Sequence, residues 1–132
     1  MKYLIDTNVI IEGLLEQEKV DQVWELFQKI SLSQMAITDF SLHSIGVILF
    51  RLKKMELFIS FFEDIIIDGI MVLSLDISDL KELYKIAQRF KLDFDDAYQY
   101  AMAEKYNLQI VSFDKDFDGT ERGKKEPSGV LL

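Results

Sequence analysis

The sequence of 132 residues contains no cysteine, one proline and one histidine. The absence of cysteine excludes disulfide bonds, thiolate metal sites and cysteine nucleophiles, and it is typical of proteins in a reducing compartment. The single histidine, His43, argues against a multi-histidine zinc site and against a serine triad. These absences narrow the chemistry to carboxylates, hydroxyls, amides and basic side chains.

The sequence also lacks a long uncharged apolar run. Residues 40–50 form the longest charge-poor stretch, which is far shorter than the roughly 20 residues of a membrane-spanning helix. Near the N-terminus, Asp6 interrupts the first apolar run, so we expect no signal peptide. We therefore expect a soluble, cytoplasmic protein with no membrane contact.

Positive charge is scarce, because 15 Lys and Arg stand against 23 Asp and Glu, for a net charge of −8. This balance argues against a protein that holds nucleic acid by overall positive charge. Hydrophobic residues make up 49% of the chain, which is too many for a disordered protein. The length is that of one ordinary domain, so we predict a single domain over residues 1–132.

Short apolar segments alternate with amphipathic ones along the chain. We predict strands at residues 3–5, 35–38, 70–75 and 108–112, with a fifth, edge strand at 129–132. We predict helices at residues 9–14, 20–30, 39–51, 55–67 and 80–90, and another that starts near residue 95. This alternation indicates βαβ units and a mostly parallel five-stranded sheet covered on both faces, a three-layer α/β/α fold.

Aspartates gather where the predicted strands end. Those at strand ends are Asp6, Asp39, Asp114, Asp116 and Asp118, and a second group at the start of the helix before the fourth strand comprises Asp93, Asp95 and Asp96. Ligands of such sheets bind beyond the carboxyl ends of the strands. If the first and fourth strands are neighbours, carboxylates from distant segments converge at one edge of the sheet.

Converging carboxylates repel one another unless protons or cations neutralise them. Oxygen ligands without His or Cys favour Mg²⁺ or Mn²⁺ over zinc. Such ions suit phosphodiester hydrolysis, because they polarise the phosphoryl oxygen, lower the pKa of water and stabilise the leaving oxygen. Each aspartate also has an ordinary structural explanation, as a helix N-cap at Asp6, a capping box at Asp93 with Asp96, or a solvated turn at residues 114–118.

Three segments resemble the motifs of PIN domains. Residues 4–11, LIDTNVII, look like the opening of that family, where a strand ends in Asp-Thr-Asn. Residues 93–106 are similar to its Asp-Ala helix, and residues 108–117 look like its strand followed by Asp-x-Asp-Phe. The resemblance covers essentially the whole chain. It implies a metal-dependent nuclease, usually an endoribonuclease, and many small members are toxins of VapBC-type toxin–antitoxin pairs.

The resemblance also implies roles for individual residues. The first, third and fourth acids of the family would be Asp6, Asp96 and Asp114. These acids would bind Mg²⁺ or Mn²⁺, with Asp116 as an auxiliary ligand. Asn8 and Ser112 would orient the carboxylates or a water molecule. RNA as substrate, a cognate antitoxin and a homodimer are the partners that the resemblance implies.

The sequence departs from the family at the second acid, usually a Glu early in the helix after the second strand. Residues 38–46 contain no Glu, and the position falls on Ser41 or His43, with Asp39 as a substitute one turn earlier. A neutral His could ligate Mn²⁺ or bind phosphate, or could be a satisfied, partly buried histidine. The alternative to a nuclease is therefore a non-catalytic PIN-like module that binds RNA or protein.

Two other classes place aspartates at strand ends. A phosphatase with Asp6 as nucleophile would usually carry a second Asp two residues later, where Asn8 stands. A receiver-type phosphoacceptor domain would carry paired acids after its first strand and its acceptor on a later strand. The sequence fits both classes poorly.

Basic residues flank the acidic segments along the chain. We predict that RNA phosphates contact Arg89, Lys91, Arg122 and Lys124. Ordinary solvated surface is the alternative explanation for each. Residues 57–67 carry more bulky apolar side chains than one buried face needs, which indicates a dimer or antitoxin surface there.

Overall fold

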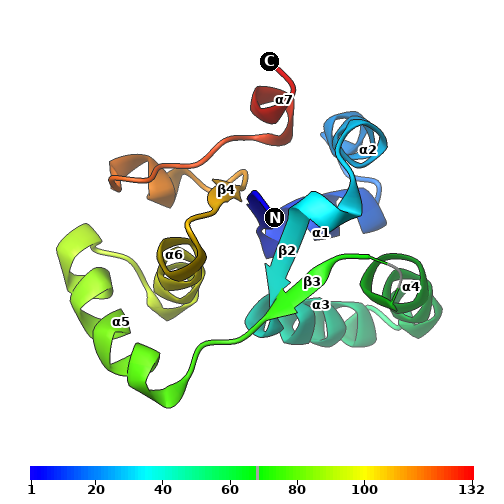
Figure 1. The fold of residues 1–132 in the computed structure, drawn as a ribbon. Helices are drawn as coiled ribbons and strands as arrows, with labels where there is room; N and C mark the ends of the chain where they lie inside the picture. Colours follow the sequence, from blue (N-terminus) through cyan, green and yellow to red (C-terminus); the bar gives the residue numbers. More distant parts are fainter. Residues whose placement is uncertain (68) are drawn as a thin grey trace.

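A parallel sheet forms the centre of the computed structural model, which describes residues 1–67 and 69–132 (Figure 1). In this part of the chain the sheet has four strands in the order β3-β2-β1-β4. They are β1 (Tyr3–Ile5), β2 (Met35–Thr38), β3 (Met71–Leu73) and β4 (Gln109–Val111). Leu4 of β1 pairs with Ala36 of β2 and Ile110 of β4. The first and fourth strands are therefore neighbours, as convergence of the acids requires.

Helices connect the strands. The α-helices are α1 (Thr7–Leu14), α2 (Val20–Lys29), α3 (Asp39–Arg51), α4 (Met55–Phe61), α5 (Ile77–Phe90), α6 (Phe94–Tyr106) and α7 (Pro127–Val130). Short segments of other helical types are η1 (Leu32–Gln34) and η3 (Lys115–Gly119), both 3₁₀, and the π-helical η2 (Phe62–Ile67). The helix predicted at residues 55–67 thus changes type at Phe62. No helix among the described residues is long and apolar enough to cross a membrane.

The strands send alternate side chains into two cores, one on each face of the sheet. The core under α5 and α6 includes Leu4, Ala36 and Ile110. The core under α1 to α4 includes Ile5, Ile37 and Val111. Figure 1 shows α5 and α6 on one side of the sheet and α1, α3 and α4 on the other. The predicted three-layer arrangement is confirmed, because helices bury the sheet on both faces.

The fifth strand predicted at residues 129–132 is wrong, because this segment belongs to α7 and the residues after it. Pro127 begins α7, and its fixed φ and missing N–H suit the first position of a helix. The edge of β4 instead forms a single parallel bridge with Lys125. The Lys125 N–H donates to the Ile110 carbonyl (2.9 Å), and its carbonyl accepts from the Ser112 N–H (2.9 Å).

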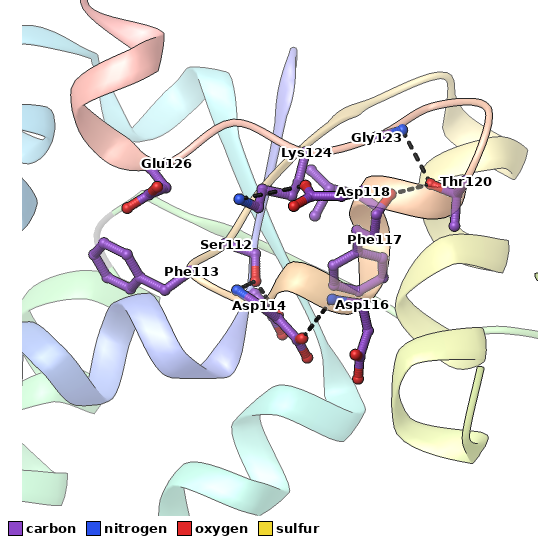
Figure 2. Close-up of polar contacts among 12 residues, drawn as sticks. Ser112, Phe113, Asp114, Asp116, Phe117, Asp118, Thr120, Gly123, Lys124 and Glu126 are labelled. Carbon is purple, nitrogen blue, oxygen red and sulfur yellow. Dashed lines mark hydrogen bonds and ion pairs between the residues drawn. The ribbon is translucent and has the colours of Figure 1, made fainter. Parts of the chain in front are cut away.

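The segment that carries the last aspartates is anchored by Phe117. This residue lies in η3 and is fully buried, at 0% exposure, in the core under α5 and α6. At the start of η3, the Asp114 carboxylate accepts a hydrogen bond from the Asp116 N–H (2.8 Å; Figure 2). The ring of Phe117 therefore holds these acids at the end of β4.

We expect Phe117→Ala to lower the free energy of unfolding by about 3–5 kcal/mol, because it removes a buried ring and leaves a cavity. Urea denaturation followed by circular dichroism measures this loss. Tyr84→Ala is the matched control, since the Tyr84 ring is 64% exposed on α5 and its removal leaves no cavity. Equal losses in the two variants would contradict the anchoring role.

Candidate functional site

The carboxyl ends of the central strands open into a cleft of about 810 Å³. Its walls come from the start of α1, from α3, from the first two turns of α6, from Leu80 of α5 and from Asp114 after β4. The acids that line it are Asp6, Asp39, Asp95, Asp96 and Asp114. The topology therefore brings together carboxylates that are far apart in the sequence, as the strand-end pattern predicts.

Two of these acids, Asp96 and Asp114, lie close enough to Asp116 for the three side chains to share one cation. One carboxylate oxygen from each of Asp96, Asp114 and Asp116 lies within 4.8 Å of the other two. Asp96 is buried, Asp114 is half-buried and Asp116 is exposed, so the group opens toward solvent. Figure 2 shows Asp114 and Asp116 projecting to the same side of η3. Because all three donors are hard oxygens, the set fits Mg²⁺ or Mn²⁺.

Asp6 lies at the end of β1 and is only 7% exposed. Its Oδ1 accepts hydrogen bonds from the Thr7 N–H (2.8 Å) and from Gln99 Nε2 (3.0 Å). Its Oδ2 accepts from Ser112 Oγ (2.7 Å) and, at 3.4 Å, from Asn8 Nδ2. Neutral donors thus fix the orientation of this carboxylate, and Asn8 and Ser112 lie where they can orient it.

Ser112 links Asp6 to the acids that follow β4. Its hydroxyl donates to Asp6 and accepts the Asp114 N–H (2.9 Å; Figure 2). Asn8 strengthens the same connection, because its Nδ2 donates to Ser112 Oγ (3.1 Å) and its Oδ1 accepts from the Phe113 N–H (3.1 Å). The start of α1 and the end of β4 are therefore held together by side chains of the site itself.

Gln99 is not among the residues predicted from the sequence, and it connects α6 to the ends of β1 and β2 and to α3. It is 3% exposed on α6. Its Nε2 donates to Asp6 Oδ1 and to Ser41 Oγ (2.9 Å), and its Oε1 accepts from Thr38 Oγ1 (2.7 Å). The only signal for it in the sequence is a polar side chain one turn after Asp96 in an otherwise apolar helix segment.

Ser41, one candidate for the second-acid position, shares its hydrogen-bond partner Gln99 with Asp6. Ser41 is fully buried, and its Oγ accepts from Thr7 Oγ1 (2.8 Å) as well as from Gln99. His43 is exposed on the cleft wall, so its interpretation as a partly buried histidine is wrong. Asp39 accepts from the Tyr98 hydroxyl (2.7 Å). A neutral pair of serine and glutamine therefore lies beside Asp6.

The basic residues predicted to contact phosphate do not line the cleft among the residues that the structure describes. They are Arg89, Lys91, Arg122 and Lys124. Lys124 pairs with Asp118 (3.4 Å; Figure 2), and Arg89 pairs with Glu121. Arg122 donates to the Leu108 carbonyl (3.3 Å), at the amino end of β4. The acids lie at the other end of the strands, beyond their carboxyl ends.

Burial and mutual repulsion favour the protonated acids. Burial, followed by the negative charges of Asp114, Asp93, Asp6 and Asp116, raises the pKa of Asp96 to about 8. Burial also raises the pKa of Asp6, although the hydrogen bonds donated to its carboxylate oppose this shift. Without a cation, the folded site therefore retains a proton near neutral pH.

We expect the metal-free protein to lose stability as pH rises from about 4 to about 8. Over this range Asp96 stays protonated in the folded chain but is ionised in the unfolded chain, where its pKa is near 3.8. The folded state then binds more protons, so the free energy of unfolding falls as pH rises. Urea denaturation in EDTA across this range measures the slope.

Asp96→Asn removes the titrating group, so its slope should be flatter than that of the parent. Asp95→Asn, at an exposed neighbouring position, is the matched control and should keep the parent slope. At pH 8, Mg²⁺ or Mn²⁺ should stabilise the parent protein more than it stabilises the Asp96→Asn variant. Parallel pH profiles for the parent and Asp96→Asn would contradict this account.

Several solved structures share the fold. VapC20 from Mycobacterium tuberculosis, described as a Sarcin-Ricin loop cleaving toxin, has a TM-score of 0.81 at 14% identity, covering 96% of this chain and 100% of that chain. FitAcB from Neisseria gonorrhoeae has a TM-score of 0.77 at 20% identity, covering 95% and 97%. A toxin–antitoxin complex from Klebsiella pneumoniae has a TM-score of 0.75 at 19% identity, covering 96% and 98%.

Comparison with curated protein sequences gives no match. At the identities above, structural likeness shows the fold alone. The family profile described as PIN domain, however, matches residues 3–123, which is most of the chain. The match contains the strand-end acids and confirms the resemblance of the three motifs. The chain therefore belongs to the PIN domain family.

Proposed function

We propose that this protein is a Mg²⁺- or Mn²⁺-dependent endoribonuclease that hydrolyses RNA phosphodiester bonds as the toxin of a VapBC-type pair. The observation that carries the proposal is the convergence of Asp96, Asp114 and Asp116 beside Asp6 in a PIN domain. PIN domains are typically metal-dependent nucleases. The toxin assignment draws on structural neighbours that are described as a toxin–antitoxin complex and as a toxin.

The residues of the chain divide the work between them. A divalent ion held by Asp96, Asp114 and Asp116 would polarise the phosphoryl oxygen and lower the pKa of the attacking water. Asp96 would give up its proton when such an ion binds, because the cation would offset the burial and the repulsion that favour the protonated acid. Asp6 adds negative charge in an orientation set by Gln99 and Ser112. In-line attack by water leaves a 5′-phosphate and a 3′-hydroxyl.

A second candidate is a non-catalytic PIN-like module that binds RNA or protein. The contact between Ser41 and Gln99 favours it, because with Ser41 at the second-acid position both that side chain and its partner are neutral. Loss of that carboxylate weakens the attraction for a cation. The module and the nuclease differ in one measurable property, which is the appearance of cleaved RNA in the presence of Mg²⁺ or Mn²⁺.

We expect Asp96→Asn and Asp114→Asn to lower the rate of RNA cleavage by about 100-fold or more, and EDTA to abolish it. Gln99→Leu should cost about 10- to 100-fold, the range typical of residues that orient metal ligands. The rate of cleavage of a labelled RNA measures these losses. Calorimetry with Mn²⁺ measures metal binding by each variant. Asp118→Asn is the control, since Asp118 lies outside the shared-oxygen group and pairs with Lys124.

The outcomes separate the candidates. Full cleavage by Asp114→Asn, or cleavage that persists in EDTA, would remove the metal-dependent nuclease. Binding of Mn²⁺ and RNA with no product at any metal concentration would favour the non-catalytic module.

We also propose that the chain forms a homodimer through an apolar patch on α3 and α4, while the cognate antitoxin is its physiological inhibitor. The patch consists of Phe50, Leu52, Met55 and Ile59, which are 50–53% exposed. Several large apolar side chains exposed on neighbouring helices are typical of homodimer interfaces.

We expect the parent to sediment as a dimer at tens of micromolar and Ile59→Asp to sediment as a monomer, because the new carboxylate would have to be buried. Lys54→Asp, at an exposed position that is not apolar, is the neighbouring control. A parent that sediments as a monomer at this concentration would overturn the dimer.

A further inference from the structure

The cleft that contains the acids has an apolar wall that metal chemistry does not require. The apolar side chains of this wall are Phe40, Val47, Ile48, Leu80 and Phe94. Binding of a cation, and of a phosphodiester through that cation, requires only the carboxylates. The apolar wall therefore points to a part of the ligand that is not phosphate.

Phe94 is the most exposed aromatic side chain of the cleft, at 55%. It is the first residue of α6 and stands two residues before Asp96. Its ring lies 6.1 Å from that of Phe40 and 6.2 Å from that of Tyr98, measured between centroids. Phe40 and Tyr98 are in turn 5.6 Å apart, so the three rings contact one another.

The two rings beneath Phe94 are held in place. Tyr98 is 7% exposed, and its hydroxyl donates to Asp39 Oδ1 (2.7 Å) and accepts from the Leu75 N–H (3.2 Å). Phe40 is half-buried and packs against the core under α5 and α6. Phe94 is therefore an exposed ring on a rigid base, next to the acids, and its position costs little entropy on binding.

The cleft offers little positive charge to RNA. Its lining in the described chain contains no Lys or Arg, and His43 is its one basic side chain. The lining aspartates repel phosphates unless a cation is bound. Affinity for a polyanion must therefore come largely from the cation and from contacts that do not depend on charge. Stacking of a nucleobase on an aromatic ring is such a contact.

We propose that Phe94 is a stacking platform for a nucleobase next to the scissile phosphodiester. The proposal rests on the proposed nuclease function and adds the residue that would contact a base of the substrate. A paired base within a duplex has its faces covered by its neighbours, so it cannot stack on a side chain without leaving the helix. Stacking on Phe94 therefore requires an unpaired base.

Phe94→Ala should weaken binding of a single-stranded adenosine decamer in Mn²⁺ about 10-fold, the cost of one lost base stack. The KM for a single-stranded substrate should rise by a similar factor, with a smaller change in kcat. Binding of a duplex of the same length should change little. Tyr84→Ala is the matched control, because Tyr84 is also an exposed aromatic residue, at 64% on α5, but does not line the cleft.

A direct readout uses indole fluorescence. Phe94→Trp in a Trp24→Phe background contains a single indole, since Trp24 is the only tryptophan of the chain. Stopped-flow mixing with the adenosine decamer in Mn²⁺ should quench this fluorescence before cleavage proceeds. An abasic strand of the same length should not, because it carries the phosphates without the bases. Equal quenching by both strands, or none by either, would overturn the platform.

The outcomes distinguish this inference from the proposed function. RNA that is bound through Phe94 but never cleaved would remove the nuclease and keep the stacking platform. RNA that is cleaved with unchanged KM and affinity by Phe94→Ala would keep the nuclease and overturn the platform. A change of sedimentation by Phe94→Ala with unchanged RNA affinity would also overturn it, because the ring would then belong to a protein interface.

Discussion

A buried carboxylate at the end of the central strand is the constraint on which the site depends. Asp6 is nearly inaccessible to water, and no lysine or arginine is among its hydrogen-bond partners in the described chain. Such a group is costly unless donors surround it. The donors come from α1, α6 and the end of β4, so the sheet edge closes around one side chain. The geometry of the neighbouring acids follows from the same contacts, because Ser112 holds both Asp6 and the Asp114 backbone.

Much of the fold can be predicted from the pattern of apolar segments, and the details that fail have local causes. Strand β2 lies at the predicted residues, because Met35–Thr38 is a short apolar run buried on both faces. The predicted fifth strand does not form, because the ring of Pro127 favours the start of a helix over a sheet edge. The extent of edge pairing depends on Lys125, and nothing in its neighbours distinguishes it as a strand residue.

The acids of the site can be predicted from motifs, but the contacts between them cannot. Asp96 and Asp114 each stand in a recognisable segment, so the sequence places them at one edge. Ser41 and Gln99 are 58 residues apart, and their hydrogen bond depends on how α3 and α6 pack. Gln99 donates to both Asp6 and Ser41, so neutral side chains lie beside the buried carboxylate. This arrangement limits the negative charge around Asp6, and it leaves the shared-oxygen group as the main attraction for a cation.

The acidic balance of the chain and the composition of the cleft have one physical consequence for ligand binding. Basic residues that flank the acids in sequence lie elsewhere in space, and Arg122 lies at the far end of β4. The field at the cleft is therefore negative until a cation binds, and a polyanion gains little from long-range attraction. Contacts with neutral parts of the ligand must then supply discrimination. In this cleft such contacts are available at the apolar wall, where Phe94 presents an aromatic face beside the carboxylates. Binding of the cation and stacking on this wall are thus complementary, because one neutralises the phosphate and the other distinguishes unpaired from paired nucleotides.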